Sequence, residues 1–591
     1  MKLSDYVAQF LVEQGITHVF GMSGGAAIHI FDSIDKRSDI ENVFVSHEQA
    51  ASIAADGYSR ATGKLGVAVS TSGPGATNLL TGTCCSYYDS IPTLMLTGQV
   101  ASHRIKGSLK IRQLGFQETD VISIFKSITK YAVQLKKPTD IKKVLQEAIF
   151  IAFNGRQGPV LIDIPDDFQR VDINPKDLIE FYPEKEPKKS GSLIEEHIQS
   201  MLDMIKKSKR PVLVIGGGVK TPAVTDKLIN LVEHLNIPVL LTWAALDFLP
   251  FDHPLRVGTF GIYGSRAGNL TIQNSDLLIT MGARLSQNHT GGILKSFARQ
   301  AKIVMIDVDN SEMNKFDKTE IKIDLKINSS ISEFIRIYNS RFIGEKLEDW
   351  NSWKEKIFYW KKVFLQEPSP SPVTPNSYVD ANDFVVGLSN HLKNDAIIFT
   401  DTGGNLTWTC NSFRPKIGQS LHSSWNNTPM GYALPASIGA SINNPRKDTT
   451  CIIGDGGLLL CLGELATVIH HKLPIKIFLF NNHCHGIQKQ TLETWLSGRL
   501  VGVNSSSGLS LPFSWEDLAN SFGFSVHTIN SIDELDNQLD NIYSLSGPVF
   551  INVEINPEQK LYPILKHGNA LENQMPELDI NQEMIVPLFK N

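Results

Sequence analysis

Short apolar runs recur along the whole chain, and each is followed by a glycine-rich turn and then by a pattern typical of an amphipathic helix. Examples are the runs from Val67 to Ser70, from Val212 to Ile215 and from Cys451 to Ile453. Strands that are apolar on both faces and alternate with helices are typical of parallel sheets covered by helices. The sequence therefore predicts an α/β protein made of doubly wound parallel sheets.

The length of 591 residues exceeds what a single hydrophobic core supports. Two stretches, at residues 174–192 and 367–376, are rich in proline, which stops helices and favours extended linkers. They predict three domains at residues 1–175, 190–345 and 365–560, followed by a tail at 561–591 that runs over the surface.

The composition excludes some classes of protein. The net charge is −5 and Lys and Arg are scattered, which argues against nucleic-acid binding. No apolar segment is long enough to span a membrane, and the chain begins with a helical pattern from Ser4 to Gln14 rather than a leader. The six cysteines lack the spacing of a metal site or a disulfide framework. We therefore expect a cytoplasmic protein with no nucleic-acid or membrane partner.

Asp455 and Asn482 are the strongest candidates for a metal site. Asp455 follows the apolar run at 451–453, and Asn482 follows the next one, at 475–480. In a strand–helix–strand unit both strand ends lie at the same edge of the sheet, where open α/β sheets bind ligands. One carboxylate, one amide oxygen and a nearby backbone carbonyl suit a hard divalent cation that binds diphosphate oxygens. An ordinary glycine-rich turn is the alternative.

Glu48 is the candidate acid in the first third of the chain. It opens a helix of small residues just after Ser46 and His47. A glutamate in the first turn of a helix usually stabilises the helix dipole. A buried carboxyl group can also transfer a proton to a bound ring, and the metal motif favours this second interpretation.

The G-D-G…N-N arrangement around Asp455 and Asn482 resembles the diphosphate–magnesium motif of thiamine-diphosphate enzymes. The resemblance implies that the cation is Mg²⁺ and that the backbone carbonyl of Cys484 is a further ligand. Other segments resemble acetolactate synthase large subunits along nearly the whole chain, among them Thr71 to Asn78, Phe116 to Asp120 and Asn427 to Tyr432. The resemblance implies that Glu48 activates the cofactor, Gln117 faces the substrate and Met430 holds the cofactor in a bent shape. For Met430, an adaptable core methionine is the alternative. Further cofactor contacts that the resemblance implies are Gly24, Gly25, Pro74, Asn78, Gly403, Gly404, Asn405, Gly456, Gly457, Gly486 and Ile487.

The middle domain resembles the flavin domain of the same family. The stretch from Val214 to Gly218 has the weak signal of a dinucleotide-binding turn. The residues that the resemblance assigns to FAD are Gly216, Gly217, Gly218, Arg284, Asp307 and Asp324. The family's D-D-R is replaced by residues 286–288 here, and its G-M-H-G-T by residues 261–265. A flavin-free domain that keeps only its structural glycines is the alternative, and we expect bound FAD.

The sequence departs from the family pattern in the segment where, by resemblance, the acceptor substrate binds. Thr491 stands at the position of a family tryptophan, which removes an apolar wall and changes which acceptor packs well. Trp495 either refills that space or belongs to the core. Gly404 and Asn405 replace the usual Q-H pair. The tail at 568–586 resembles that of carboligases that acetylate keto sugars.

We therefore predict a thiamine-diphosphate-dependent carboligase of acetolactate synthase type that uses Mg²⁺ and FAD. It decarboxylates a 2-keto acid, expected to be pyruvate, and transfers the acyl unit to a second carbonyl compound, either a 2-keto acid or a keto sugar. In this family the counterparts of Glu48 and Asp455 meet across two chains, which implies a homodimer or homotetramer. A flavin-coupled oxidase of pyruvate oxidase type and a simple 2-keto acid decarboxylase are the enzymatic alternatives, and a non-catalytic scaffold is the least favoured.

Overall fold

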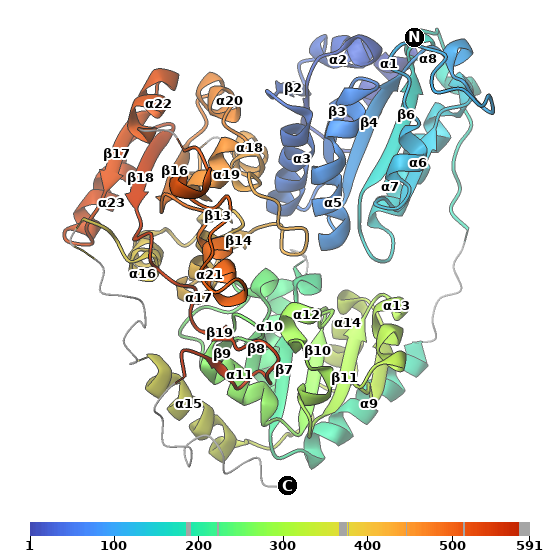
Figure 1. Cartoon of the computed structure of the whole chain (residues 1–591). Coiled ribbons are helices and arrows are strands. Elements are labelled where there is room, and N and C mark those ends of the chain that lie inside the picture. Colours follow the sequence, from blue (N-terminus) through green and yellow to red (C-terminus); the bar gives the residue numbers. More distant parts are fainter. Residues whose placement is uncertain are drawn as a thin grey trace.

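The computed structural model describes residues 1–184, 191–220, 224–365, 375, 377–444, 446–511 and 514–577. Within these residues the chain forms three six-stranded parallel sheets, each associated with helices (Figure 1). The predicted fold class is confirmed. Most of the predicted linker at 367–376 and the tail beyond residue 577 lie outside the described residues. No helix in the described part of the chain combines the length and apolar character needed to cross a bilayer.

The first domain is built on a sheet with the strand order β2-β1-β3-β4-β6-β5. Its strands are β1 (His18–Gly21), β2 (Glu41–Phe44), β3 (Gly66–Ser70), β4 (Thr93–Gln99), β5 (Tyr131–Gln134) and β6 (Val160–Pro165). Its helices are α1 (Leu3–Glu13), α2 (Ile28–Asp35), α3 (Glu48–Thr62), α4 (Pro74–Asn78), α5 (Leu80–Asp89), α6 (Val121–Phe125), α7 (Ile141–Phe153) and α8 (Asp166–Gln169). Strands β3, β4 and β6 are buried along their whole length, as expected for strands covered on both faces.

The third domain repeats this topology, with the order β14-β13-β15-β16-β18-β17. Its strands are β13 (Ile397–Thr400), β14 (Ser420–His422), β15 (Thr449–Gly454), β16 (Ile475–Asn481), β17 (Ser525–Ile529) and β18 (Val549–Glu554). Its helices are α16 (Ala381–His391), α17 (Gly404–Ser412), α18 (Ala433–Asn443), α19 (Asp455–Leu459), α20 (Glu464–His470), α21 (Gly486–Trp495), α22 (Trp515–Phe522) and α23 (Leu535–Ser544). In both domains the strand order reverses beside the first strand, and ligands bind at such switch points.

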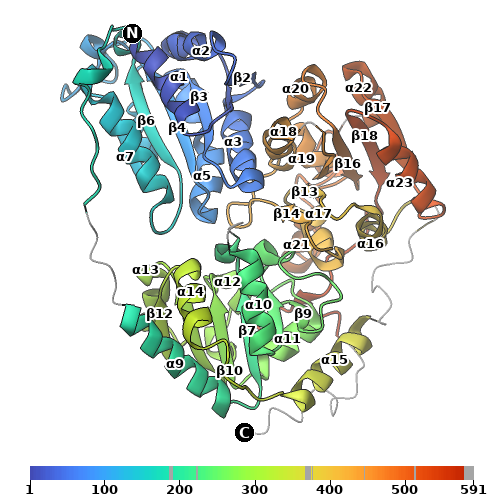
Figure 2. The ribbon, with the colours of Figure 1, turned by 180° about the vertical axis from the view of Figure 1, so that it is seen from behind.

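The middle domain has the strand order β12-β11-β10-β7-β8-β9. Its strands are β7 (Pro211–Ile215), β8 (Val239–Leu241), β9 (Arg256–Thr259), β10 (Leu277–Met281), β11 (Lys302–Asp307) and β12 (Leu325–Asn328). Its helices are α9 (Gly191–Lys207), α10 (Thr225–Leu235), α11 (Arg266–Gln273), α12 (Gln287–Thr290), α13 (Asn310–Asn314), α14 (Ile331–Arg341) and α15 (Asn351–Leu365). This domain lies below the other two, and the view from behind shows the same arrangement (Figures 1 and 2).

The end of the middle domain and the course of the tail differ from the prediction. The predicted end at residue 345 is too early, because Trp350, Trp353 and Trp360 on and next to α15 are buried in the core of this domain. The described part of the tail also packs here. Its strand β19 (Ile564–Leu565) pairs with β20 (Gln574–Met575), and the Leu565 amide donates to the carbonyl of Ile262. The tail was predicted to run over the surface, and its described part instead packs at a defined place on the middle domain.

The first and third domains meet along helices α3 and α18. A Cβ added to Gly57 would lie 2.2 Å from the carbonyl oxygen of Ala436, and one added to Gly439 would lie 1.9 Å from that of Ala54. The two helix backbones therefore touch, because these two positions lack side chains. This contact fixes the position of the first-domain sheet relative to the third-domain sheet, and with it the positions of their strand ends.

Candidate active site

The carboxyl ends of three neighbouring strands in the third domain carry the predicted diphosphate and metal residues. Asp401 follows β13, Asp455 follows β15 and Asn482 follows β16, and β15 pairs with both of the other strands. The sequence prediction that Asp455 and Asn482 lie at one edge of a parallel sheet is therefore confirmed in its geometry.

Asp455 has the burial and the hydrogen bonding expected of a metal ligand. The side chain is buried and Oδ1 accepts a hydrogen bond from the Gly456 amide at 2.7 Å, but the equally buried Oδ2 has no hydrogen-bond partner among the residues that the structure describes. Burial raises the pKa of Asp455 to about 7, although the backbone amides of Gly456, His483 and Cys484 act in the opposite direction. An unpaired buried carboxylate oxygen is costly, and a divalent cation would offset that cost. The residues present fit Mg²⁺, with Asn482 and the Cys484 carbonyl as further oxygen ligands.

Asp401 holds the segment that carries Met430. Its carboxylate accepts hydrogen bonds from the amides of Gly431, Tyr432 and Ala433, at 3.0, 2.7 and 3.1 Å. These amides lie at the start of α18, where a negative charge is favourable. Burial nevertheless raises the pKa of Asp401 to about 6. Asp401 is not among the residues predicted from the sequence, although it stands just before the predicted Gly403 and Gly404.

Gly456 lies between two side chains at the same edge. A Cβ on Gly456 would be 2.4 Å from Nε2 of His485 and 3.1 Å from Cε of Met430. Met430 and Gly456 are thus brought together as predicted, and His485 joins them without having been predicted. His485 is half-buried, and burial lowers its pKa. The only sequence signal was its place next to Gly486, which does not reveal the direction of an imidazole.

Most of the other predicted diphosphate-side residues have local structural roles as well. Gly403 has φ of 107°, a conformation that favours glycine. The Asn405 side chain is buried and donates to the Asp401 carbonyl at 2.7 Å. A Cβ on Gly457 would lie 2.2 Å from Oδ2 of Asp401, and one on Gly404 2.7 Å from the Trp408 ring. These residues therefore help to determine the conformation of the loop that follows β13, through their backbone angles, hydrogen bonds and close contacts.

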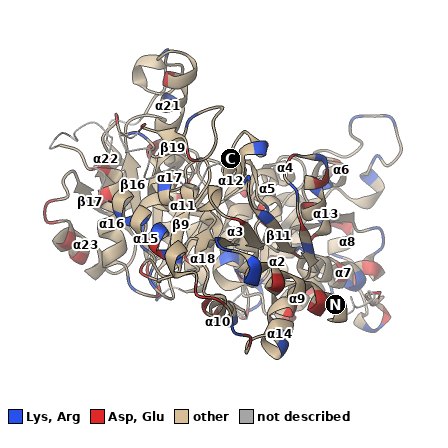
Figure 3. Cartoon of the chain, turned by 90° about the horizontal axis from the view of Figure 1, so that it is seen from below, with Lys and Arg blue, Asp and Glu red and all other residues tan. Residues whose placement is uncertain are grey.

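Helix α21 begins directly at the metal-site loop and projects from the body of the molecule (Figure 3). A Cβ on its first residue, Gly486, would lie 2.6 Å from Nδ2 of Asn482, and Ile487 packs against the core of the third domain. Thr491 is exposed and its hydroxyl donates to the Ile487 carbonyl. Trp495 is 66% exposed, so within this chain it does not belong to the core.

Glu48 is the first residue of α3 and its carboxylate is buried in the first domain. The Asn78 side-chain amide donates to its Oε2 at 2.9 Å, and a Cβ on Gly75 would lie 3.2 Å from its Oε1. His47 caps the helix by accepting from the Gln49 amide. The turn at 71–78 thus lies against the acid.

The other first-domain candidates gather at the same turn. A Cβ on Gly24 would be 2.5 Å from the Thr71 Cβ, whereas Gly25 has open space and Pro74 is exposed. Gln117 has φ of 64°, and its backbone lies against Gly73. A non-glycine residue in this conformation is strained, and such strain clusters at functional sites. The structure brings together all the residues predicted in this domain.

The predicted flavin residues are only partly brought together. Gly216 to Gly218 follow β7 and Arg284 follows β10, at the switch point of the middle sheet, and Asp307 ends β11 at the same edge. Asp324 precedes β12 at the opposite edge, where its carboxylate accepts from the Ile303 amide. The amides of Gly216 and Gly218 already donate to the carbonyls of Met281 and Gly282. The location fits a nucleotide, but these two amides are not free to bind phosphate.

A small cavity of about 220 Å³ lies between the first and third domains. It is lined by His47 and Gln49, which flank Glu48, and by Gly431 and Glu464 among others. Pockets for small molecules usually measure about 300–1,000 Å³. The cavity within one chain is therefore smaller than a typical cofactor site.

Three family models match consecutive parts of the chain. They describe the N-terminal TPP binding domain (residues 1–124), the central domain (residues 198–335) and the C-terminal TPP binding domain (residues 401–553) of thiamine pyrophosphate enzymes. The site residues Glu48, Asp455 and Asn482 fall within the two TPP binding domains.

Curated relatives resemble the chain over almost its whole length. The "Probable acetolactate synthase large subunit" of Methanocaldococcus jannaschii is 34% identical over 100% of this chain and 98% of its own length. The acetolactate synthase large subunit of Lactococcus lactis is 32% identical, over 96% and 94%. The isozyme 1 large subunit of Escherichia coli is also 32% identical, over 96% of each chain. The chain therefore belongs to the thiamine pyrophosphate enzymes, and within them to the family of acetolactate synthase large subunits.

Proposed function

We propose that this protein is a thiamine-diphosphate-dependent carboligase of acetolactate synthase type. It decarboxylates a 2-keto acid, with pyruvate as the expected donor, and transfers the acyl unit to a second carbonyl compound. The observation that carries the proposal is the buried, unpartnered Oδ2 of Asp455, at a strand end beside Asn482. The family membership supports the same conclusion.

Each site residue has a defined task in this reaction. Asp455, Asn482 and the Cys484 carbonyl would hold Mg²⁺, and the glycines at 456 and 457 give the diphosphate access to the backbone. Bound thiamine diphosphate supplies the carbon nucleophile and the electron sink that a 2-keto acid needs to lose carbon dioxide. Glu48, oriented by Asn78, would exchange a proton with the pyrimidine ring. Met430 would support the cofactor, and Gln117 would orient the substrate.

The acceptor is proposed to be bulkier or more polar than pyruvate, such as a larger 2-keto acid or a keto sugar. On the projecting helix α21, Thr491 has only a small side chain and the Trp495 indole is exposed, so neither forms a buried apolar wall within this chain. A hydrophobic pocket that loses an indole discriminates less against large acceptors.

Three further proposals complete the functional picture. FAD would bind at the switch point of the middle sheet, with Arg284 and Asp307 as its contacts and with Asp324 too distant to join them. Two chains would associate as a homodimer or a pair of such dimers, because Glu48 of one chain would serve the cofactor held by Asp455 of the other. The protein would act in the cytoplasm.

The test is product analysis with the purified protein, ¹³C-labelled pyruvate, thiamine diphosphate, Mg²⁺ and a panel of keto acids, aldehydes and keto sugars. We expect release of carbon dioxide and one ligated product identified by mass. Free aldehyde alone would indicate a simple decarboxylase, and flavin bleaching with peroxide formation would indicate an oxidase. No release of carbon dioxide and no ligated product would refute the proposal.

A further inference from the structure

The turn that leads into Glu48 is held by the third domain of the same chain. Strand β2 ends at Phe44 and α3 begins at Glu48, so residues 45–47 set where the carboxylate stands. Within this turn the Ser46 amide donates to Oε1 of Glu464 at 3.0 Å, and the Ser46 hydroxyl donates to the Gly463 carbonyl at 3.0 Å. Glu464 is the first residue of α20. More than 400 residues of sequence separate the partners, with |i−j| of 418 for the amide bond.

The contact is close and well defined. A Cβ on Gly463 would lie 2.9 Å from the Ser46 Cβ, so the two backbones approach more tightly than a larger residue permits. Glu464 is 2% exposed, and its second oxygen accepts from the Thr467 hydroxyl at 2.8 Å. A carboxylate that accepts a backbone N–H bond in a buried setting restrains that backbone strongly.

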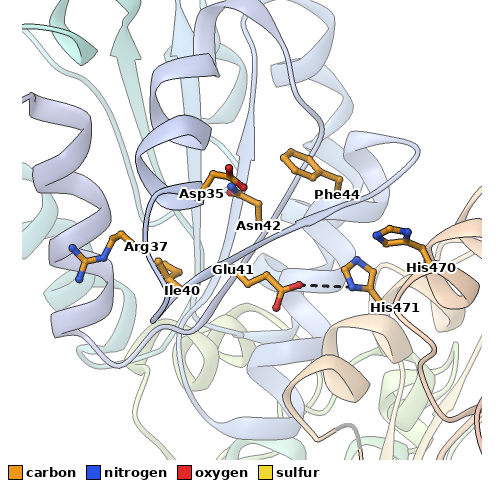
Figure 4. Close-up of a pocket in the computed structure, with 8 residues that line it drawn as sticks. All are labelled: Asp35, Arg37, Ile40, Glu41, Asn42, Phe44, His470 and His471. Atoms are coloured by element: carbon orange, nitrogen blue, oxygen red, sulfur yellow. Dashed lines mark ion pairs between the residues drawn. The ribbon is translucent and has the colours of Figure 1, made fainter.

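The other end of α20 makes a looser contact with the same part of the first domain. His471, which follows the helix, lies with its Nδ1 3.8 Å from Oε1 of Glu41, the first residue of β2 (Figure 4). Glu41 is exposed and a cavity of about 280 Å³ opens here, lined also by Asn42, Phe44 and His470. An ion pair at this distance with one exposed partner contributes little. The end of α20 that carries Glu464 is therefore the one that restrains the turn.

Glu464 also stands close in sequence to the predicted metal site. Asp455 opens α19, and α20 follows it after a short turn. One chain thus connects its own metal-binding loop to the turn before its own Glu48. If Glu48 serves a cofactor held by a second copy of the chain, this connection links two cofactor sites.

The electrostatics of Glu464 match a positioning role rather than proton transfer to a ligand. Burial raises its pKa to about 7, while the Thr467 hydroxyl and the backbone amides of Ser46 and His47 act in the opposite direction. Its partners are thus groups of the protein itself. The interdomain cavity of about 220 Å³ beside it is lined by His47, Cys461 and Glu464, and neither Glu48 nor Asp455 is among its lining residues.

We propose that Glu464 is a positioning residue that fixes the turn at 45–47 and thereby sets the position of the Glu48 carboxylate for cofactor activation. This inference rests on the proposed function, because it needs Glu48 to act on thiamine diphosphate. It assigns to the third domain a second task beyond holding the diphosphate.

The experiment measures the step in which Glu48 would act. The full-length protein is saturated with thiamine diphosphate and Mg²⁺, and exchange of the thiazolium C2 proton for deuterium is followed by quenched-flow NMR. Binding of the cofactor is measured separately from quenching of tryptophan fluorescence, and Tm reports stability. The variants are Glu464→Leu, which keeps volume but removes the acceptor, Glu464→Gln, which keeps one acceptor oxygen, and the control His471→Ala at the other end of α20.

We expect Glu464→Leu to slow C2 exchange at least about tenfold, which is within the range of rate losses that a misplaced catalytic acid causes. Cofactor affinity should stay within about threefold of wild type. Glu464→Gln restores most of the rate and His471→Ala leaves it unchanged. In the Glu48→Gln background, Glu464→Leu causes no further loss, because both changes act through one group. If Glu464→Leu does not fold, Gly463→Ala pushes α20 away from Ser46 and is expected to slow exchange in the same way.

Exchange at the wild-type rate in Glu464→Leu, or in Gly463→Ala where that variant does not fold, overturns the inference. A loss that adds fully to that of Glu48→Gln also overturns it. A drop in Tm without a drop in exchange rate also overturns it, since that is what a merely structural contact produces. Failure of the proposed function is a different outcome. In that case the wild-type protein does not accelerate exchange, or Glu48→Gln does not slow it.

Discussion

The Tyr432 hydroxyl donates a 2.5 Å hydrogen bond to Oδ1 of Asp56 and so joins the start of α18 to the middle of α3. Asp56 also accepts from Arg60 at 2.6 Å, and Arg60 donates to Asp89 at 2.8 Å. Asp89 in turn accepts from the Trp425 amide at 2.8 Å. This buried network therefore holds both ends of the segment at 425–432 that carries Met430.

From this network we predict how much two conservative substitutions lower the free energy of unfolding. Tyr432→Phe removes one hydrogen bond to a buried carboxylate and should lower the free energy of unfolding by about 1.5–3 kcal/mol. Arg60→Lys should cost at least as much, because a single ammonium group cannot bridge Asp56 and Asp89 with the geometry of a guanidinium. Urea unfolding measures both. A change below about 0.5 kcal/mol in both variants contradicts the role of the network.

Gly439→Ala should separate α3 from α18. The new Cβ would stand 1.9 Å from the Ala54 carbonyl oxygen, a backbone atom that cannot rotate away. We expect a loss of at least about 2 kcal/mol from overpacking. Gly191→Ala at the start of α9 is the matched control, because a Cβ there meets no atom of the described residues within 4 Å. Equal stability of the two variants would be evidence against close helix packing.

Asp163 predicts a pH-dependent stability. It is fully buried within strand β6, opposite Thr97 of β4, and burial raises its pKa from 3.8 to about 6 despite hydrogen bonds from Thr97, Gln134 and Gln99. A raised carboxyl pKa means that the folded chain holds the proton more tightly, so stability is lost as the pH rises from about 4 to 6. Asp163→Asn should therefore be more stable than wild type at pH 8, by on the order of 3 kcal/mol. The advantage should shrink toward pH 4, as thermal unfolding at several pH values would show.

Glu48→Gln should lower carboligase activity by roughly 10²–10⁴-fold. The amide keeps the volume and the contact with Asn78 but cannot give up a proton. Binding of thiamine diphosphate should persist, because on the proposed mechanism Mg²⁺ and diphosphate would be held by the third domain. Steady-state kinetics and cofactor titration separate the two effects, and full activity would exclude Glu48 as the acid.

Asp455→Asn should weaken Mg²⁺-dependent binding of thiamine diphosphate by at least about tenfold. The substitution removes the only carboxylate of the proposed ligand set while keeping its size. Isothermal titration with and without Mg²⁺ measures the loss. Asp401→Asn serves as a comparison. Its carboxylate accepts hydrogen bonds from backbone amides next to Met430, so this substitution should disturb the Met430 segment more than it weakens Mg²⁺ binding. Unchanged Mg²⁺ dependence in Asp455→Asn would rule out this metal site.

Local signals were enough to predict the parallel sheets and the edge at which the site lies. The runs at 67–70, 212–215 and 451–453 are strands β3, β7 and β15, because a strand buried on both faces needs apolar residues throughout. Asp455 and Asn482 follow such strands directly, so their proximity followed from topology alone. The family resemblance added roles for Glu48 and Met430 that no spacing could supply.

Other parts of the site could not be read from local patterns. His485 faces Gly456 and Met430 because of the course of one loop. Asp324 lies at the opposite strand end from the other flavin candidates. Glu464 had no signal at all, since a glutamate at the start of a helix is ordinary.

The amino-acid sequence by itself determined the three α/β domains, the strand ends that carry Asp455 and Asn482, and the acid at the start of α3, because each depends on periodicity or on neighbours along the chain. Only the tertiary structure decided that Tyr432 reaches Asp56 and that Glu464 holds Ser46. These contacts join residues hundreds of positions apart. They exist because glycines at 57 and 439 let two whole domains pack backbone to backbone, and no local pattern encodes that fit.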